Sequence, residues 1–272
     1  MTSDHHFKNK NVLITGASSG IGAELARAFA KEGANLGLLA RRTDRLLEIV
    51  SDSERQGVKA LAITCDVTQE HDQALAVSQI HEKLGTLDVV IANAGFGVVD
   101  DFEKLTMADF ERQFATNIYG VLRTVYATLD DLKKSKGRLV IVGSALGHMV
   151  LPQYSAYCMS KFAMTALAQS LYIELAHYGI SVTLINPGYI NTEFRNINKF
   201  GGYQEGLRPA TANRSRMNAD KAANIIVSAT RDRKRECTIT LLGKTGVLIS
   251  RLFPGFLPWL YQKQWTKNKS TD

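Results

Sequence analysis

Short apolar runs alternate along this chain with longer stretches in which apolar residues recur at helical spacing. The runs lie at Asn11–Thr15, Asn35–Ala40, Val58–Thr64, Leu87–Ala92, Arg138–Gly143, Ile180–Asn186 and Cys237–Leu241. They are apolar at nearly every position, which is typical of strands buried on both faces of a parallel sheet. Between them, sets such as Ile21, Leu25, Ala28 and Phe29 follow one face of a helix. The pattern predicts an α/β fold with a doubly wound, mostly parallel seven-stranded sheet and helices on both faces.

This alternation continues without a linker rich in Pro, Gly or Ser, so it predicts a single domain over residues 1–272. We expect its core at 8–192, a last helix and strand at 219–242 and a tail at 243–272. Residues 193–218 are polar and contain glycine. Such an insertion is typical of a lid or substrate loop, with a solvated excursion as the alternative.

A glycine-rich turn directly follows the first predicted strand and precedes the first predicted helix. It reads Thr-Gly-Ala-Ser-Ser-Gly-Ile-Gly over Thr15–Gly22. Glycines permit a tight turn and a close approach of the backbone to a pyrophosphate, whose charge suits a helix N-terminus. The strand before it and the helix after it therefore favour a dinucleotide site over a plain loop.

Two arginines end the second predicted strand. A site that prefers NAD usually has an acidic residue here to bind the ribose 2′-hydroxyl. This strand instead ends in Ala40-Arg41-Arg42, and the first acid is Asp44. Because guanidinium groups bind phosphate well, the pair predicts a 2′-phosphate and hence NADP(H).

A tyrosine and a lysine four residues apart provide candidate acid–base chemistry. Tyr157 and Lys161 share one face of a predicted helix, and Ser144 stands thirteen residues before the tyrosine. An ammonium beside a phenol favours the phenolate and so makes the phenol a better proton-transfer group near neutral pH.

Together these residues resemble the short-chain dehydrogenase/reductase family in its single-domain form. The resemblance covers roughly residues 8–242. Its ordered elements are the Thr15–Gly22 turn, Asp66-Val67, Asn93-Ala94-Gly95, Asn117, Ser144, Tyr157, Lys161 and Pro187-Gly188 with Thr192. It implies a Rossmann-type fold and NADP-dependent interconversion of a carbonyl and a secondary alcohol.

The resemblance also implies a role for each catalytic residue. Tyr157 would donate the proton to a carbonyl oxygen, and Lys161 would lower the pKa of that phenol and bind the nicotinamide ribose. Ser144 would hold the substrate oxygen. Asn117 would maintain a helix irregularity and a water path from Lys161 to solvent.

Cofactor contacts follow from the same resemblance. They are Gly16, Ser18, Ser19, Gly20, Ile21, Gly22, Arg41, Arg42, Asp66, Val67, Asn93, Ala94, Gly95, Tyr157, Lys161, Pro187, Gly188, Ile190 and Thr192. Asp66-Val67 would contact adenine, and the Pro187–Thr192 segment would hold the carboxamide. The chain departs from the family where Ala92 replaces a second Asn, where Gly143 replaces a second Ser, and where Ser19 replaces a basic residue. The NADP(H) prediction therefore rests on Arg41 and Arg42.

The charge of the chain is concentrated at one end. The 272 residues have a formal net charge of +7. Residues 1–194 hold 18 Lys and Arg against 21 Asp and Glu, whereas 195–272 hold 15 against 5. This body of charge −3 and segment of charge +10 favour an acidic or amphipathic substrate, or an anionic membrane surface, over nucleic acid.

The tail is also apolar. Residues 246–261 read GVLISRLFPGFLPWLY and are too short and too broken by Arg251, Pro254 and Pro258 to span a bilayer. Packing on the domain or a dimer contact is one interpretation. The other is a peripheral membrane contact through 246–269, with apolar side chains embedded and lysines at anionic headgroups. A hydrophobic substrate would suit that placement.

Two other functions use a related fold, and only the first of them stays open. A non-catalytic NADP-binding sensor or scaffold would use the same fold, although it would not require the Ser144, Tyr157, Lys161 and Asn117 set. A sugar epimerase or dehydratase would resemble the extended branch of the family, whose larger C-terminal domain has no room here.

Other residue patterns bear on compartment and assembly. Cys65, Cys158 and Cys237 are widely spaced, which disfavours disulfides, and no secretory signal is visible, so a cytoplasmic location is expected. The histidines lack HExxH spacing, so no metal is expected, and His148 is interpreted as a surface-loop residue rather than part of the substrate site. The resemblance implies a homodimer or homotetramer through helices near 105–134 and 154–178.

Overall fold

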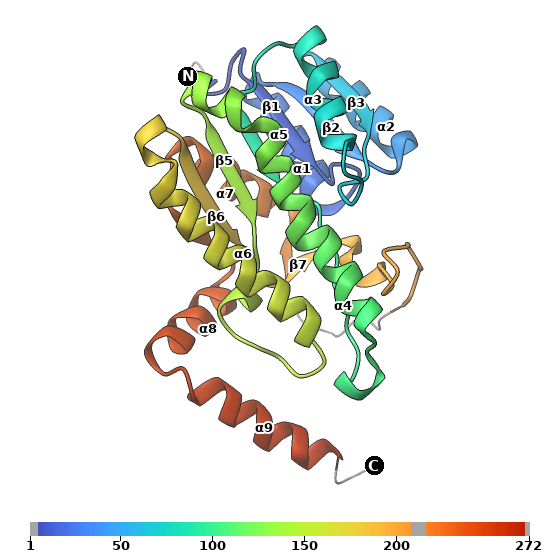
Figure 1. Cartoon of the computed structure of the whole chain (residues 1–272), viewed down its shortest axis with the longest axis vertical. Coiled ribbons are helices and arrows are strands. Elements are labelled where there is room, and N and C mark those ends of the chain that lie inside the picture. The colour runs from blue at the N-terminus through green and yellow to red at the C-terminus, as the bar shows by residue number, and fades with distance from the viewer. Residues whose placement is uncertain (1–4, 208–215, 270–272) are drawn as a thin grey trace.

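The computed structural model describes residues 5–207 and 216–269, and a central parallel sheet organises them (Figure 1). The strands of this sheet are β1 (Asn11–Thr15), β2 (Asn35–Ala40), β3 (Ala60–Thr64), β4 (Val89–Ala92), β5 (Arg138–Val142), β6 (Ser181–Asn186) and β9 (Glu236–Thr238). Their order is β3-β2-β1-β4-β5-β6-β9, and each adjacent pair is parallel. The predicted seven-stranded, doubly wound fold is confirmed.

Helices lie on both faces of the sheet and, at the C-terminal end of the described chain, beyond its carboxyl edge. They are α1 (Gly20–Lys31), α2 (Thr43–Glu54), α3 (Asp72–Lys83), α4 (Met107–Phe114), α5 (Gly120–Ser135), α6 (Ser155–Glu174), α7 (Ala219–Arg231), α8 (Leu241–Leu252) and α9 (Phe256–Lys269). A second, two-stranded sheet pairs β7 (Ile190–Asn191) with β8 (Met217–Asn218).

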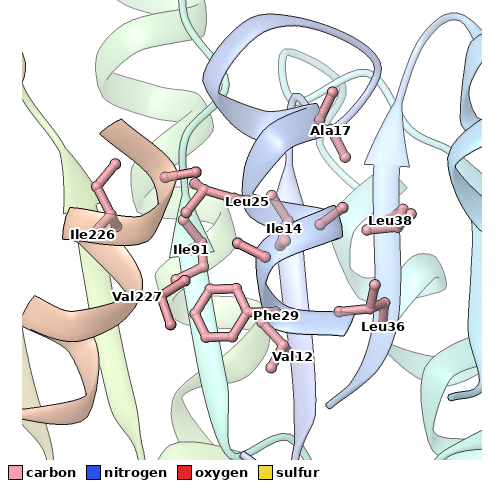
Figure 2. Close-up of a cluster of buried hydrophobic side chains, with 14 of the residues drawn as sticks. Val12, Ile14, Ala17, Leu25, Phe29, Leu36, Leu38, Ile91, Ile226 and Val227 are labelled. Atoms are coloured by element: carbon pink, nitrogen blue, oxygen red, sulfur yellow. The ribbon is translucent and has the colours of Figure 1, made fainter. Parts of the chain in front are cut away.

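Alternate residues along the strands belong to two separate hydrophobic cores, one on each face of the sheet. Val12 and Ile14 of β1 face a core that includes Phe29 of α1 and Ile226 of α7, as Figure 2 shows. The intervening Leu13 faces the opposite core, to which α3, α5 and α6 contribute. Because both faces are covered, the strands are apolar throughout, and this explains the continuous runs in the sequence.

The chain reverses direction across the sheet between β1 and β4. From β1 it proceeds outward to β2 and β3, and then returns to β4 on the other side of β1. The loops after these two strands therefore separate at the carboxyl edge and leave a crevice, which is where doubly wound sheets bind ligands.

The last predicted strand and one predicted helix differ most from the structure, while the other strand bounds differ by at most two residues. The last strand ends at Thr238 rather than Leu241, because Thr240 adopts a positive φ of 69° and its hydroxyl caps α8 by accepting the Gly243 N–H at 3.1 Å. The long helix expected near 105–134 is divided into α4 and α5 by a π-helical turn at Ala115–Tyr119.

Candidate active site

The glycine turn after β1 forms a backbone cradle at the carboxyl edge. Gly16 and Gly20 have φ values of 67° and 56°, which side chains with a Cβ rarely adopt. A Cβ on Gly22 would lie 2.3 Å from the Gly16 oxygen, so α1 can approach the turn only with glycine there. In the described chain, Ser19 forms no side-chain cap on α1, whose first turn lacks an acidic residue. The exposed N–H groups and the cradle fit a pyrophosphate.

The loop after β4 holds this turn in place. The Asn93 side-chain amide donates to the Thr15 oxygen at 2.9 Å and to the Gly16 oxygen at 3.3 Å. In return, the Thr15 hydroxyl accepts the backbone N–H groups of Asn93 and Ala94 at 3.0 and 3.1 Å. The two loops that border the crevice are thus joined by four hydrogen bonds.

The predicted adenine contact, Asp66-Val67, follows β3. The Asp66 carboxylate accepts hydrogen bonds from the backbone and the hydroxyl of Thr68, at 2.9 and 2.8 Å. Val67 is buried and packs near Gly120 at the start of α5. These contacts position the segment at the same edge of the sheet as the glycine turn.

The arginines at the end of β2 are held by different partners. The Arg42 guanidinium donates to Ser19 at 3.0 Å and to Ser18 at 3.4 Å, and so lies over the glycine turn. Arg41 donates instead to the Gly201 oxygen at 2.8 Å, within the predicted substrate loop.

One carboxylate also reaches this cationic cluster. Glu193 accepts two hydrogen bonds from Arg45, at 2.7 and 2.8 Å, and lies 3.7 Å from Arg42. Neither Glu193 nor Arg45 was expected here, because they are 148 positions apart and belong to no recognised motif.

Tyr157 and Lys161 extend from α6 into the buried centre of the edge. Tyr157 is 8% exposed and Lys161 is 6% exposed. The Lys161 side-chain nitrogen lies 5.7 Å from the centre of the Tyr157 ring. Lys161 donates to the Val142 oxygen at the end of β5, at 2.9 Å. Because both sites are buried, each neutral form is favoured.

Burial moves the two pKa values in opposite directions. It raises the pKa of Tyr157 to about 12, although a hydrogen bond with the Ser144 side chain acts against this rise. It lowers the pKa of Lys161 to about 8. The phenol therefore retains its proton at neutral pH, while the lysine is close to titrating.

Ser144 sits where β5 turns into a short 3-10 helix at Ala145–Gly147. Its hydroxyl accepts the Leu146 N–H at 3.1 Å and so fixes the turn. The adjacent Ala145 N–H donates to the Pro187 oxygen at 2.9 Å. This bond joins the Ser144 turn to the segment after β6.

Asn117 lies in the π-helical turn between α4 and α5. Its amide nitrogen donates to the Phe96 oxygen at 3.0 Å and to the Ser160 hydroxyl at 3.1 Å, and its oxygen accepts the Phe96 N–H at 3.1 Å. A Cβ on Gly95 would lie 3.1 Å from the Asn117 oxygen and 3.8 Å from the Lys161 nitrogen. Asn117 and Lys161 thus flank Gly95.

The Pro187–Thr192 segment closes the other side of the crevice. A Cβ on Gly188 would meet the Thr240 hydroxyl at 2.2 Å, so this glycine permits tight packing before α8. Ile190 enters the small β7–β8 sheet, and the Thr192 side chain packs against Gly20 of the glycine turn. Every sequence-predicted site residue thus lies at or near the carboxyl edge.

Phe194 is a further residue of the candidate site, and the sequence did not indicate it. Its ring meets the Tyr157 ring edge-to-face at 5.6 Å, and it packs so closely on Gly97 that a Cβ there would lie 2.8 Å away. The predicted substrate loop therefore covers Tyr157 with an apolar ring. The part of that loop at 208–215 lies outside the described residues.

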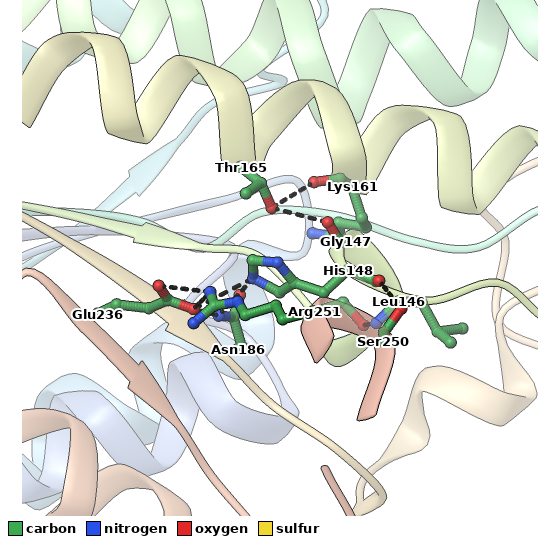
Figure 3. Close-up of polar contacts among 10 residues, drawn as sticks. Leu146, Gly147, His148, Lys161, Thr165, Asn186, Glu236, Ser250 and Arg251 are labelled. Carbon is green, nitrogen blue, oxygen red and sulfur yellow. Dashed lines mark hydrogen bonds and ion pairs between the residues drawn. The ribbon is translucent and has the colours of Figure 1, made fainter. Parts of the chain in front are cut away.

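The interpretation of His148 as a surface-loop residue was wrong. Its side chain is 8% exposed and lies 3.2 Å from the Glu236 carboxylate, which also accepts hydrogen bonds from Arg251 of α8 and Asn186 of β6. Figure 3 shows these four side chains converging. His148 and Arg251 together hold the pKa of Glu236 at about 2. No local sequence pattern indicated that His148 is buried, because its partner Glu236 lies 88 positions further along the chain.

Comparisons with known proteins identify the family of this chain. The family model for short chain dehydrogenase matches residues 10–199. A Dehydrogenase/reductase SDR family protein 7-like from Dictyostelium discoideum is 31% identical over 265 residues, which span 94% of this chain and 82% of the relative. The 3-ketodihydrosphingosine reductase of Bos taurus is 36% identical over 183 residues, spanning 65% of this chain and 55% of the relative.

A solved structure gives the same result. The alcohol dehydrogenase of Thermococcus sibiricus, complexed with 5-hydroxy-NADP, is 31% identical with a TM-score of 0.75, over 85% of this chain and 96% of that one. The fold and the edge site thus define an NAD(P)-dependent oxidoreductase that acts on CH–OH groups. The chain belongs to the short-chain dehydrogenase/reductase family.

Proposed function

We propose that the protein is an NADP(H)-dependent oxidoreductase that interconverts a carbonyl and a secondary alcohol on a hydrophobic substrate, with Tyr157 as the general acid or base. The observation that supports this most directly is the buried Tyr157, protonated at neutral pH and grouped with Ser144 and Lys161. A protonated phenol is the form needed to donate to a carbonyl oxygen.

The chain's own residues account for the proton and for substrate orientation. In carbonyl reduction, Ser144 donates a hydrogen bond to the substrate oxygen, and Tyr157 transfers its proton to that oxygen as the C=O double bond becomes a C–O single bond. Lys161, when charged, favours the phenolate that remains. NADPH, when bound, supplies the hydride to the carbonyl carbon.

Arg41 and Arg42 support the preference for the phosphorylated cofactor. They directly follow β2, where an NAD site usually has a carboxylate, and Arg42 already lies over Ser18 and Ser19 of the glycine turn. Asp66, Val67, Asn93 and the Pro187–Thr192 segment would hold the rest of the dinucleotide. Asn117 would maintain the proton path behind Lys161.

A groove beside the catalytic helix supports a hydrophobic substrate. It has a volume of about 270 Å³ and is lined by Leu151, Pro152, Tyr154, Tyr261, Gln264 and Trp265. The Tyr154 ring lies 6.3 Å from the Tyr157 ring, so the groove is one side chain away from the proposed acid. Phe194 adds an apolar surface on the other side. The bovine relative is itself named as a reductase of a keto compound.

We further propose a homodimer or homotetramer built on α4–α5 and α6. Their outer faces include exposed apolar side chains, among them Tyr126, which is 76% exposed, together with Tyr119, Met159, Phe162 and Ile173. We place the enzyme in the cytoplasm, with peripheral contact at the inner face of a membrane. In the described residues, no helix has the length and apolar character needed to cross a bilayer.

The test is a panel of aldehydes and ketones of increasing chain length, assayed with NADPH and with NADH at the nicotinamide absorbance. We expect NADPH to be preferred and catalytic efficiency to rise with chain length. Tyr157→Phe should reduce turnover by about 10²- to 10⁴-fold while NADPH binding persists. Unchanged turnover in this variant would refute the proposed role of Tyr157, and NADPH binding without turnover on any substrate would support the sensor alternative.

A further inference from the structure

The two C-terminal helices present apolar side chains to solvent instead of burying them. We call the set of Leu248, Leu252, Phe253, Phe256 and Trp259 the C-terminal apolar surface. Leu252 and Phe253 are 63% and 64% exposed, and Trp259 is 49% exposed. By contrast, Val247 and Leu257 are buried. The segment is therefore fastened to the domain by a few side chains while several of its largest ones face outward.

The charged residues from Cys237 to Thr271 are all basic, although Arg251 is paired with the Glu236 carboxylate of β9. From Cys237 to Thr271 the chain contains no Asp or Glu, but it contains Lys244, Arg251, Lys263, Lys267 and Lys269. The Lys263 nitrogen lies 4.2 Å from the centre of the Trp259 ring, so a cation borders the exposed indole directly. Apolar and aromatic side chains flanked by lysines are the composition of a helix that lies in the headgroup region of a membrane.

The position of the segment connects it to the proposed substrate path. In Figure 1, α8 and α9 lie beyond the carboxyl edge of the sheet, at the end of the molecule opposite the N-terminus. Tyr261 and Trp265 of α9 form one wall of the groove that Tyr154 lines on the other side. A membrane bound by α9 would therefore border this groove, whose Tyr154 ring lies 6.3 Å from the Tyr157 ring.

We propose that the C-terminal apolar surface binds the headgroup region of a bilayer rich in anionic lipid, with Phe253, Phe256 and Trp259 embedded and Lys263 and Lys267 at the lipid phosphates. This deepens the proposed peripheral membrane contact, and it does not depend on the proposed reaction. Charge favours a bilayer over a second copy of the chain, because a two-fold interface would bring Lys263 and Lys267 of both copies together.

The chain contains its own probe for this test. Trp259 and Trp265, its two tryptophans, both lie in α9, so intrinsic fluorescence reports on this helix alone. The full-length protein is titrated with phosphatidylcholine vesicles, with or without phosphatidylglycerol. We expect a blue shift with the anionic vesicles, quenching by brominated acyl chains, and loss of both at high salt.

Variants distinguish the apolar contribution from the charged one. The double substitution Phe253→Ser with Phe256→Ser should abolish the blue shift, because it removes embedded side chains and keeps both tryptophans. Lys263→Gln and Lys267→Gln should each weaken binding about fivefold. The matched control is Leu75→Ser with Lys83→Gln on α3, which changes an exposed leucine and an exposed lysine far from α9 and should not alter binding.

Three results would overturn the proposal. They are no binding to anionic vesicles at low salt, equal binding to neutral vesicles, and a Phe253→Ser with Phe256→Ser variant that changes the oligomeric state in sedimentation without changing vesicle binding. The last result would assign the surface to a contact between copies. Activity on a small, water-soluble carbonyl separates this inference from the proposed function, because turnover without vesicle binding refutes only the membrane contact.

Discussion

The sheet body and the C-terminal segment use the same kinds of apolar residue in opposite ways. Val12, Leu13 and Ile14 of β1 are at most 1% exposed because helices cover both faces of the sheet. Within residues 5–207 and 216–269, no second layer covers Leu252 of α8 or its C-cap residue Phe253, and both stay largely exposed. Burial of apolar surface contributes roughly 25 cal/mol per Å². In the sheet body this burial already stabilises the fold, whereas the apolar surface of the C-terminal segment can still be buried by association with a partner.

The two regions nevertheless meet beside the proposed catalytic centre. The Ser250 hydroxyl of α8 donates to the His148 oxygen at 2.6 Å, and Arg251 binds the Glu236 carboxylate. His148 follows directly after the 3-10 helix that Ser144 caps. We therefore expect most substitutions to affect either turnover or α9 fluorescence, and a few at this junction to affect both.

The largest expected effect belongs to the body alone. Lys161→Met should lower kcat for carbonyl reduction by about 10²- to 10⁴-fold, because it removes the cation beside Tyr157 while filling the same buried space. Tryptophan emission with and without anionic vesicles should stay unchanged. Lys134→Met, at an exposed position of α5, is the control and should retain full activity. A large change in α9 emission in Lys161→Met would break the separation of the two regions.

Removal of the arginine over the glycine turn should have the next largest effect. Arg42→Ser is expected to raise the Kd for NADPH by roughly 10- to 100-fold, since a hydrogen bond to a charged group contributes about 1.5–3 kcal/mol. The Kd for NADH should change little, because NADH lacks the 2′-phosphate. Both are measured by nicotinamide fluorescence, with Arg55→Ser at the end of α2 as the control. Equal weakening of NADH and NADPH binding would show that Arg42 only supports the turn.

The pH dependence of carbonyl reduction should follow the charge of Lys161, with kcat/KM falling about tenfold per pH unit above the pKa of this lysine. Because burial lowers the pKa of Lys161 to about 8, the charged form is lost as the pH rises through this value. Tyr157, with a pKa of about 12, keeps its proton over the same range. We therefore expect kcat/KM for reduction at saturating NADPH to fall above about pH 8, whereas alcohol oxidation, which needs the phenolate, should rise with pH. A reduction profile that stays flat above pH 8 would contradict this assignment.

The smallest expected effect lies at the junction. Glu236→Gln removes the charge that His148 and Arg251 share and should cost about 1 kcal/mol of unfolding free energy, the modest value of a partly exposed ion pair. Since the folded-state pKa of Glu236 is depressed to about 2, its contribution is present above the ordinary value of 4.5 and is lost as the pH falls toward 2. The variant should therefore lose less stability on acidification than the wild type, as measured by circular dichroism.

The junction variant also tests the coupling of the regions. A modest fall in kcat together with altered α9 emission would show that Glu236 joins α8 to the Ser144 turn. Glu82→Gln, on the exposed face of α3, provides the control for loss of a carboxylate. Unchanged values of both readouts would mean that α8 and the catalytic turn are independent.

The fold was predictable because burial on both faces leaves a local signature. Six of the seven strands of the sheet lie within the apolar runs, and β9 overlaps the last run from Cys237. The loops after β1, β4 and β5 place Gly16, Asn93 and Ser144 at one edge. The Glu193–Arg45 pair and the Phe194–Tyr157 contact left no such signature, because they join distant segments through side chains alone. His148 was misjudged for the same reason, since its exposure depends on Glu236.

The opposite placement of the two described chain ends has a practical consequence for experiments. In Figure 1 the described chain begins near the amino edge of the sheet, at the top of the view, whereas α9 lies beyond the carboxyl edge. A purification tag or fluorescent fusion at the N-terminus would stand far from both the crevice and the vesicle. The same fusion at the C-terminus would sit beside α9, and the protein should therefore be immobilised and labelled through its N-terminus.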